Sequence, residues 1–505
     1  MKRSIALGLA AAAALAVAPA AASTAAAGPA PQFGPCPEDI ATPYPQLRCA
    51  TVEVPLDHAD PGGEQVQLLV SKLPARDPQA RRGSLLLNPG GPGGPGADFA
   101  GAMGEMAPPQ VRDSYDLIGF DTRNTAHSTP ISCVDPATHW ANPLPDPDSP
   151  ATREINWRRS EAYADGCAQR AGKYLPHLNT PTNARDMDLV RAALGEQKIS
   201  FLGYSYGTYL GAVYGQLFPE RVDRMILDSS VNPDVSEIWY GNNLAQDVAA
   251  QQRLDHFFGW VARHDRVFHL GTEPGAVKAA WERTQAELRR APRGPLGPSE
   301  LIEISFNALY GESDWQPLAQ GLADFQLRGD DRALAAMVTP KDALAENGNA
   351  IYNAVECADA PWPSRRAEWE RDSRRMAAEH PFAAWFNSWT VAPCRTWQAP
   401  RQQPTKITGE GLPPVLMFNS EHDVATPHAG AVEMHHSLPS SVLVTERDAG
   451  KHGVWALAGN AEANRIGTDY LVRGALPPED IDIAGHPEPD PSAPETRSSR
   501  TYDLR

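Results

Sequence analysis

A single serine lies between two glycines in the segment Phe201-Leu-Gly-Tyr-Ser-Tyr-Gly-Thr208. Residues 198–202 are typical of a short buried strand, and residues 208–218 are typical of a helix. A G-x-S-x-G pentapeptide at a strand-to-helix junction is a nucleophile elbow, a sharp and strained turn that raises the serine hydroxyl above the sheet. The two glycines lack the side chains that would clash in so tight a turn. The sequence therefore predicts that Ser205 is a catalytic nucleophile rather than a serine that merely caps the helix.

Short apolar runs alternate with helical patterns along much of the chain. Strands are predicted at residues 51–54, 66–73, 83–87, 115–120, 222–227, 414–418 and 441–445, and helices at residues 183–194 and 461–473. Asn183 is expected to cap the first of these helices. Strands that alternate with helices favour a mostly parallel sheet with helices on both faces.

The composition divides the 505-residue chain into a core, an insertion and a tail. Residues 233–410 are Trp-rich, charged and helical in pattern, and this block is predicted to form a cap over the carboxyl ends of the strands, where ligands bind in such folds. The core then comprises residues 36–232 and 411–475. Residues 476–505 form an acidic, Pro-rich tail that is expected to be partly loose.

The first 35 residues are assigned to a signal peptide and a short pro-segment whose end the sequence leaves open. Lys2 and Arg3 precede an apolar run at residues 5–17, and small-residue cleavage sites follow between residues 18 and 27. The apolar run is too short to span a bilayer. We therefore expect a secreted protein, with no membrane association once the signal peptide has been removed.

The net charge and the cysteine content further restrict the partners, cross-links and cofactors that we expect. The net charge is −17 and basic runs are short, which argues against nucleic acid and anionic membranes and suits a site for a cationic group. Six cysteines in an exported chain indicate disulfides, and we expect nearest neighbours to pair: Cys36–Cys49, Cys133–Cys167 and Cys357–Cys394. No spacing matches a zinc site, so neither a metal nor a cofactor is expected.

A serine nucleophile needs a histidine base, and in this kind of fold the chain order is serine, acid, histidine. His452 follows the last predicted strand within Asp448-Ala-Gly-Lys-His-Gly453, where glycines allow the loop to bring the imidazole back over the strand ends. Two histidines, His435 and His436, fall on a predicted surface helix, and His422 and His428 precede the last strand. We therefore predict His452 as the base.

The acid is expected at the end of strand 414–418, which runs into Asn419-Ser-Glu-His-Asp423. Asp423 is placed best, because Thr426-Pro427 opens a helix directly after it. Glu421 is an alternative, and so is Asp228, since the acid can come from a neighbouring strand end.

Two backbone amides are expected to stabilise the oxyanion of the reaction. One belongs to Tyr206, the residue after the nucleophile, and the other to the loop Pro89-Gly-Gly-Pro-Gly93. Residues without side chains let the backbone approach a substrate closely. As a phosphate cradle the same loop is weak, because its prolines remove amide donors and no Lys-Ser pair follows it.

Over residues 36–473 the chain resembles the secreted tripeptidyl aminopeptidases of actinobacteria, α/β-hydrolases related to proline iminopeptidases. The motifs that carry the resemblance are Asn88-Pro-Gly-Gly-Pro-Gly93, Asp116-Leu-Ile-Gly-Phe-Asp-Thr-Arg123, Gly203-Tyr-Ser-Tyr-Gly207, Glu356-Cys-Ala-Asp359, Asp423-Val-Ala-Thr-Pro427 and Gly450-Lys-His-Gly453. It implies an α/β-hydrolase fold with a large helical cap, and an exopeptidase that removes tripeptides from free N-termini.

The resemblance also implies site residues: Ser205 as nucleophile, Asp423 as acid, His452 as base, and Gly91 and Tyr206 as donors to the oxyanion. The sequence departs from the family at Asn124-Thr-Ala-His-Ser128, where glycines are usual, and at Pro89, where the iminopeptidases have histidine. The first departure concerns the shape of a loop and hence fine specificity, and it leaves the triad untouched.

An aminopeptidase must also hold the ammonium group of its substrate, which a sheltered carboxylate does well. The candidates are Glu356, Asp359 and Asp228. A carboxylesterase, a lipase or a proline iminopeptidase using the same triad is an alternative reading, and a non-catalytic binding protein on a hydrolase scaffold is another. We expect peptide or protein N-termini as the substrate and a monomeric enzyme.

Overall fold

The computed structural model of the chain describes residues 30–143 and 149–492. Most of the predicted signal peptide, at residues 1–29, and the end of the predicted tail, at residues 493–505, lie outside the described residues. Within the described residues, none of the helices combines the length and the apolar character that crossing a membrane requires.

In the described ranges, nine strands form one sheet in the order β1-β2-β4-β3-β5-β6-β7-β8-β9. The strands are β1 (Arg48–Pro55), β2 (Gln65–Leu73), β3 (Gly83–Asn88), β4 (Tyr115–Phe120), β5 (Ile199–Tyr204), β6 (Val222–Asp228), β7 (Val415–Ser420), β8 (Val442–Arg447) and β9 (Ile481–Ala484). Strand β2 pairs antiparallel with β1 and β4, and all other neighbours pair parallel. The carboxyl ends of β3 and of β5 to β8 therefore meet at one edge.

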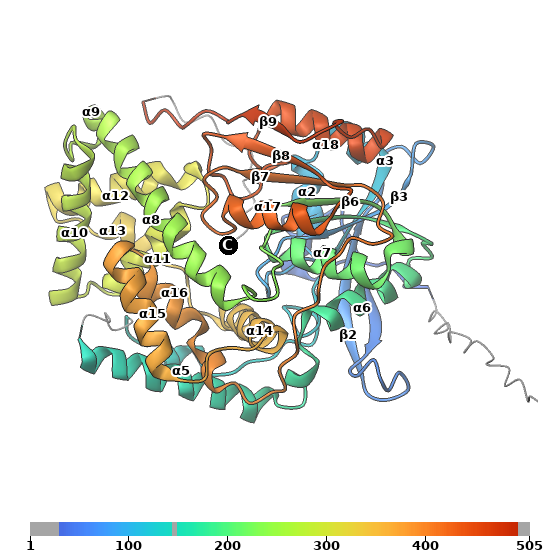
Figure 1. Cartoon of the computed structure of the whole chain (residues 1–505), viewed down its shortest axis with the longest axis horizontal. Coiled ribbons are helices and arrows are strands. Elements are labelled where there is room, and N and C mark those ends of the chain that lie inside the picture. Colours follow the sequence, from blue (N-terminus) through green and yellow to red (C-terminus); the bar gives the residue numbers. More distant parts are fainter. Residues whose placement is uncertain (1–29, 144–148, 493–505) are drawn as a thin grey trace, which may run out of the picture.

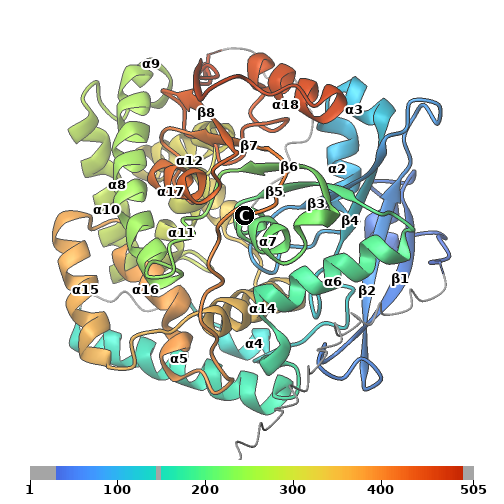
Figure 2. The same cartoon turned by 45° about the vertical axis from the view of Figure 1, so that its right-hand side comes forward.

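Helices cover both faces of the sheet (Figures 1 and 2). One face carries α2 (Phe99–Met106), α3 (Pro109–Ser114) and α18 (Ala461–Arg473), and the other carries α6 (Thr180–Ala193), α7 (Tyr206–Leu217) and α17 (His428–Ser437). Four short elements lie in the connections: α1 (Glu38–Ala41), α4 (Pro136–His139), η1 (Leu175–His177) and η2 (Pro219–Arg221).

Strand β3 contributes side chains to two hydrophobic cores, one on each face of the sheet. Leu85 and Leu87 are fully buried in the same cluster as Phe99 of α2, whereas Leu86 is fully buried in the cluster that contains Tyr209 of α7. Successive side chains of a strand point to opposite faces, so a continuous apolar run is what a strand covered on both faces requires. The predicted α/β fold class is confirmed.

A helical cap lies between β6 and β7. Its elements are α8 (Tyr240–Arg263), α9 (Asp265–Phe268), α10 (Pro274–Arg290), α11 (Pro298–Ala308), η3 (Glu312–Asp314), α12 (Trp315–Arg328), α13 (Arg332–Met337), α14 (Ala343–Asp359), α15 (Arg366–Glu379), α16 (Ala384–Val391) and η4 (Ala392–Thr396). The long helix α5 (Pro150–Ala171) precedes β5 in the chain, yet it packs on α16 and η4 and runs along the cap in Figure 1. The region assigned to the core thus contributes a helix to the cap.

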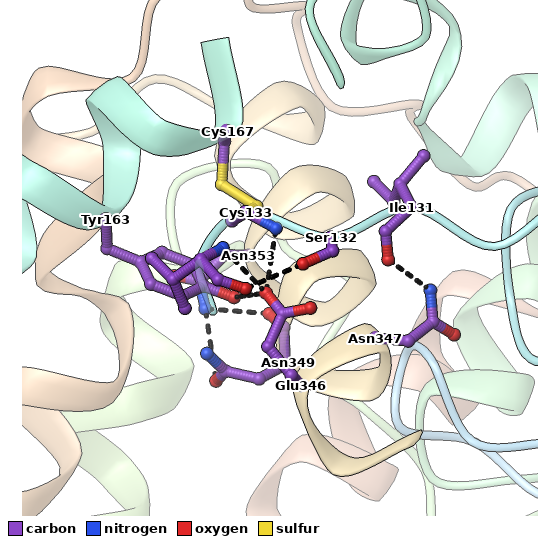
Figure 3. Close-up of a disulfide and its surroundings, with 10 residues drawn as sticks. Ile131, Ser132, Cys133, Tyr163, Cys167, Glu346, Asn347, Asn349 and Asn353 are labelled. Atoms are coloured by element: carbon purple, nitrogen blue, oxygen red, sulfur yellow. Dashed lines mark hydrogen bonds between the residues drawn. A yellow bond between two sulfur atoms is a disulfide. The ribbon is translucent and has the colours of Figure 1, made fainter. Parts of the chain in front are cut away.

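Three disulfides fasten these parts: Cys36–Cys49, Cys133–Cys167 and Cys357–Cys394. Figure 3 shows the second one, which joins the loop after β4 to α5. Beside it, the buried carboxylate of Glu346 on α14 accepts hydrogen bonds from the Cys133 amide at 2.8 Å and the Tyr163 hydroxyl at 3.3 Å. The start of α14 is therefore fixed to a cross-linked loop.

Two elements differ from the sequence prediction. Helix α6 begins at Thr180 rather than at Asn183, because Asn179 is the cap in place of Asn183 and its side chain accepts a hydrogen bond from the Thr182 amide. Residues 481–484, within the tail expected to be partly loose, form the ninth strand. They pair with β8 and bury Ile483 against the core.

Gly467 of α18 leaves no room for a side chain, because a Cβ would overlap the indole of the buried Trp455. We predict that Gly467→Ala lowers Tm by roughly 1–3 °C, since overpacking a core costs about 1–3 kcal/mol and the chain is long. Scanning calorimetry measures this. Gly275→Ala is the matched control, because nothing lies within 4 Å of its added Cβ. An equal fall in Tm for both variants would contradict the Trp455 contact as the cause.

Candidate active site

The nucleophile elbow joins β5 to α7 at the carboxyl edge of the sheet. Ser205 has φ 56° and ψ −128°, a positive φ that non-glycine residues rarely adopt. A Cβ on Gly203 would overlap the Gly207 backbone, and a Cβ on Gly207 would lie 2.8 Å from Asn88 Oδ1. The strained turn is therefore held on both sides by close backbone packing, as the two glycines of the motif predicted.

The glycine loop after β3 lies directly against this elbow. A Cβ on Gly90 would lie 2.7 Å from the Ser205 Cβ and 3.3 Å from the Tyr206 amide nitrogen. Gly91 and Ser205 line the same cavity. Tyr206 is the first residue of α7, where an amide has no acceptor within the helix. The two amides expected to bind the oxyanion thus both belong to backbone next to the serine.

Asp423 and His452 form a completely buried pair. The Nδ1 atom of His452 lies 3.0 Å from Oδ1 and 2.9 Å from Oδ2 of Asp423, and both side chains are fully shielded from solvent. The aspartate also accepts hydrogen bonds from the amides of Ala425 and Thr426 at 2.9 and 3.0 Å. A carboxylate with this many donors is held in one orientation and directs the imidazole.

Because Nδ1 of His452 faces the carboxylate, the other ring nitrogen is the basic one. The Nε2 atom is buried and has no hydrogen-bond partner within the described residues, so it makes no hydrogen bond to the Ser205 hydroxyl. Nucleophile-to-base contacts are often longer without substrate than in the reacting complex. A ring nitrogen without a partner, opposite the one held by the carboxylate, is nevertheless what a general base presents.

Asp228 holds the histidine loop beside the elbow. Its carboxylate accepts hydrogen bonds from the amides of Val454 at 2.9 Å and Trp455 at 2.7 Å, and its carbonyl accepts one from the Ser205 amide at 3.1 Å. Burial, opposed by these backbone donors, raises the pKa of Asp228 to about 8. This residue, predicted as an alternative acid and as an amine ligand, contacts loop backbone instead of His452 Nδ1.

The other candidates from the sequence lie elsewhere. Glu421 pairs with Arg447 at 3.1 Å and accepts the Asp448 amide, on the outer side of the strand ends. His428 contacts the Thr445 hydroxyl and His435 contacts the Ser441 hydroxyl, which are structural contacts. Among the described residues, one group of potential metal ligands (Glu421, His422 and Asp448) has its ligand atoms within 4.8 Å of one another. Its glutamate is already paired.

Thr426 is a site residue that sequence reasoning did not assign. Its hydroxyl lies 3.1 Å from Asp423 Oδ2 and 3.4 Å from His452 Nδ1. The signal was an aspartate followed closely by a threonine, because an aspartate side chain commonly accepts the backbone amides two and three residues ahead in a turn. We interpreted Thr426 only as the start of the helix.

A cavity of about 1380 Å³ lies above Ser205, between the core and the cap. Its walls come from the glycine loop, from α5, and from the cap helices α11, α14 and α16. One wall is aromatic and consists of Phe382, Trp385, Phe386 and Trp389, whereas the charged side chains of Arg159, Glu303 and Lys341 also face the space. The cavity could therefore accommodate a short peptide with apolar side chains.

Two buried carboxyl groups follow on α14, beyond the residues of this helix that line the cavity. Glu356 follows the cavity-lining Tyr352 by one helical turn, is 3% exposed, and has an Oε2 atom with no hydrogen-bond partner in the described residues. Asp359 accepts hydrogen bonds from the Thr180 amide and hydroxyl at 2.8 and 2.6 Å. Burial raises the pKa of Glu356 to about 8 and that of Asp359 to about 7.

The two aspartates at the strand ends can be told apart by substitution. We predict that Asp423→Asn lowers kcat about 10⁴-fold, because the imidazole loses its orienting carboxylate. Asp228→Asn should lower kcat by at most about 100-fold, since it only shifts the loop that carries His452. Steady-state kinetics on a peptide anilide measures both. Equal losses, or a larger loss for Asp228→Asn, would contradict the assignment of Asp423 as the acid.

Known proteins are similar to this chain in sequence over most of its length. Residues 380–482 match the family described as TAP-like protein. The tripeptidyl aminopeptidase of Streptomyces coelicolor is 43% identical over 469 residues, which cover 90% of this chain and 86% of that protein. Serine protease Hip1 of Mycobacterium tuberculosis is 30% identical, covering 85% and 86%, and carboxylesterase B of the same organism is 31% identical, covering 90% of each chain.

The identity to the Streptomyces protein spans nine-tenths of the chain and nearly the whole of that relative. The elbow, the buried acid–histidine pair and the cap over a large cavity form one continuous structure over the same length. The chain therefore belongs to the tripeptidyl aminopeptidase family of α/β-hydrolases, as its motifs predicted.

Proposed function

We propose that this protein is a secreted, monomeric serine exopeptidase that releases tripeptides from free N-termini. The observation that carries the proposal is the fully buried Asp423–His452 pair, whose free Nε2 belongs to the loop held beside the strained Ser205 elbow. The cap over this site supports a substrate that enters by one end. The division into a core at 36–232 and 411–475 and a cap at 233–410 is part of the same proposal.

Each group has one role in the proposed reaction. His452 Nε2 takes the proton of the Ser205 hydroxyl as the oxygen attacks the scissile carbonyl, and the amides of Gly91 and Tyr206 stabilise the resulting oxyanion. The protonated imidazole then gives its proton to the leaving amine as the C–N bond breaks. Water, deprotonated by the same nitrogen, attacks the acyl-enzyme, and release of the tripeptide restores the serine.

Glu356 is the best-placed partner for the substrate's ammonium group. It lies on the face of α14 that carries Asn349, Tyr352 and Asn353 into the cavity, at i, i+3, i+4 and i+7 spacing. A buried carboxyl group with an unpartnered oxygen and a raised pKa lacks the cation that would stabilise its charge. A bound ammonium group would supply it and fix the distance from the N-terminus to Ser205.

Asp359 is better explained as a structural group. Both of its oxygens already accept hydrogen bonds from Thr180, and the Thr180 hydroxyl lies 2.9 Å from the Tyr206 hydroxyl. The aspartate therefore anchors the start of α6 to α14 and orients the side chain next to the nucleophile. Only Glu356 keeps an oxygen for a ligand.

An esterase is the second candidate, favoured by the 31% identity to carboxylesterase B over 90% of each chain. The same triad would hydrolyse an ester, so the triad itself does not discriminate between the two activities. The buried Glu356, whose Oε2 atom has no partner in the described residues, does discriminate, because an ester without an amine has no use for a carboxylate there.

The proposed activity has a direct test. We predict that Ser205→Ala lowers turnover of an alanine-rich tripeptide anilide about a millionfold, because the nucleophile is lost. The wild-type enzyme should cleave this anilide far better than its N-acetylated form or a short acyl ester. Release of the anilide chromophore measures all of them, and mass spectrometry of the products shows whether three residues leave per cut. Preference for the ester or the blocked peptide would favour the esterase instead.

We predict that Glu356→Gln raises KM for the free-amine anilide at least about tenfold and leaves hydrolysis of the N-acetylated form nearly unchanged, because an ion pair is lost. For the wild type, kcat/KM should rise as the pH approaches 8, where the carboxyl group becomes ionised. It should fall again as the substrate amine loses its proton. The Gln variant should lack the rising limb attributed to Glu356. Asp359→Asn is the control, and an unchanged KM in Glu356→Gln would refute the amine site.

A further inference from the structure

The segment after β9 crosses from the sheet to the cap. Strand β9 adds to β8 at the edge of the core, and Figure 1 shows the chain continuing from there toward α8. Glu488 pairs with His256 at 2.7 Å and with Arg263 at 2.6 Å, and the carbonyl of Pro489 accepts a hydrogen bond from Trp260 Nε1 at 3.0 Å. Residues 481–489, here called the strap, therefore contact both parts of the molecule.

His486 forms the inner contact of the strap. Its Nδ1 atom lies 3.0 Å from Glu446 Oε1 on β8, and its Nε2 atom lies 2.9 Å from Glu312 Oε2 on η3 of the cap. The side chains of Glu446 and Glu312 are 0% and 8% exposed, and that of His486 is 12% exposed. One imidazole thus links a buried carboxylate of the core to a buried carboxylate of the cap.

Both carboxylates belong to elements that hold the loop of the catalytic histidine. On the cap side, the turn before Glu312 contributes the Tyr310 carbonyl, which accepts the His452 amide at 2.7 Å, and the Tyr310 ring packs edge-on against the imidazole at 5.2 Å. On the core side, Ser420 Oγ lies 3.0 Å from Glu446 Oε2 and 2.8 Å from the Lys451 carbonyl. His452 lies between these two supports.

Arg253 of α8 completes the cap support. Its guanidinium is ion-paired with Glu312, lies 4.5 Å from the centre of the Trp315 ring, and packs so closely on Gly450 that a Cβ there would overlap it. Gly450, in the loop that carries His452, therefore lies in close contact with a buried arginine of the cap. The position of the loop depends on where the cap turn is held relative to the sheet.

We propose that the strap is a clamp between cap and core, and that His486 is a positioning residue that sets the loop of His452 by bridging Glu312 and Glu446. The inference rests on the proposed function, in which His452 is the general base. It assigns a role in the reaction to a C-terminal segment that contacts neither the nucleophile nor the cavity.

The charges around the bridge suit a protonated imidazole. The groups that face it are Glu446 from β8 and Glu312 from η3, with Arg253 from α8 behind Glu312. Burial alone would lower the pKa of His486, but hydrogen bonds to Glu312 and Glu446 raise it to about 9, above its ordinary value of 6.5. Its stabilising contribution is therefore fully present below pH 6.5 and is lost as the pH rises through about 9.

The test compares His486→Gln with the matched control Glu488→Gln on the same strap. Glutamine is neutral and carries both of its N–H donors on one nitrogen, so it cannot replace the charged bridge made by two ring nitrogens. We therefore expect kcat for the tripeptide anilide to fall about tenfold, with KM changed by less than about twofold. The control removes the two ion pairs of the exposed Glu488, each of which contributes little, and should retain the wild-type kcat. Calorimetry of both variants checks that the fold is intact.

A pH profile separates positioning from a general loss of stability. Because a fluorophosphonate carries no amine, its inactivation rate reports only the serine and its base. For the wild type this rate should fall above about pH 9, where the bridge formed by His486 is lost. His486→Gln should lack the alkaline fall. If this variant unfolds, Glu312→Gln provides the same comparison from the cap side.

These experiments can overturn the proposed role of His486 and can separate its failure from failure of the proposed function. Wild-type kcat together with an unchanged alkaline limb in His486→Gln would overturn the proposal, and so would equal losses in His486→Gln and Glu488→Gln. Failure of the proposed function would look different. In that case the wild-type enzyme itself would resist the fluorophosphonate, or Ser205→Ala would keep its activity.

Discussion

At the centre of this enzyme, the backbone of the loop after β3 packs directly against the backbone of the elbow after β5. The two strands are hydrogen-bonded neighbours with Asn88 opposite Gly203, so their carboxyl ends emerge side by side. A single methyl group at Gly90 or Gly207 would push the loop and the elbow apart. Because this contact fixes two amide donors next to Ser205, the histidine loop and the cap have a rigid reference against which to be placed.

Several features of this site could be predicted from local sequence because they depend on local geometry. The elbow glycines, the acid after β7 and the histidine after β8 each follow a strand, and parallel strands bring their carboxyl ends to one edge. That single rule predicts that Ser205, Asp423 and His452 gather. The α/β fold class and the family membership inferred from these motifs are confirmed.

The remaining features depend on contacts between residues far apart in the chain. The carboxylate of Asp228 binds the amides of Val454 and Trp455, more than 220 positions away, and no local pattern could indicate that partnership. Helix α5 packs on the cap although it precedes the elbow in sequence. Strand β9 is only four residues long, and its acidic, Pro-rich surroundings favour a loose segment unless the exposed edge of β8 is available to pair with.

The insertion of the cap has a consequence for how the enzyme is made. Ser205 is synthesised 218 residues before Asp423, and until β7 appears the edge of β6 has no partner. The three cystines span only 13, 34 and 37 residues and all precede β7, so each can close before Asp423 and His452 have been synthesised. A nascent or truncated polypeptide thus carries a serine without its base. On the proposed assignment of the triad, peptidase activity is absent until β8 and the loop of His452 have been synthesised.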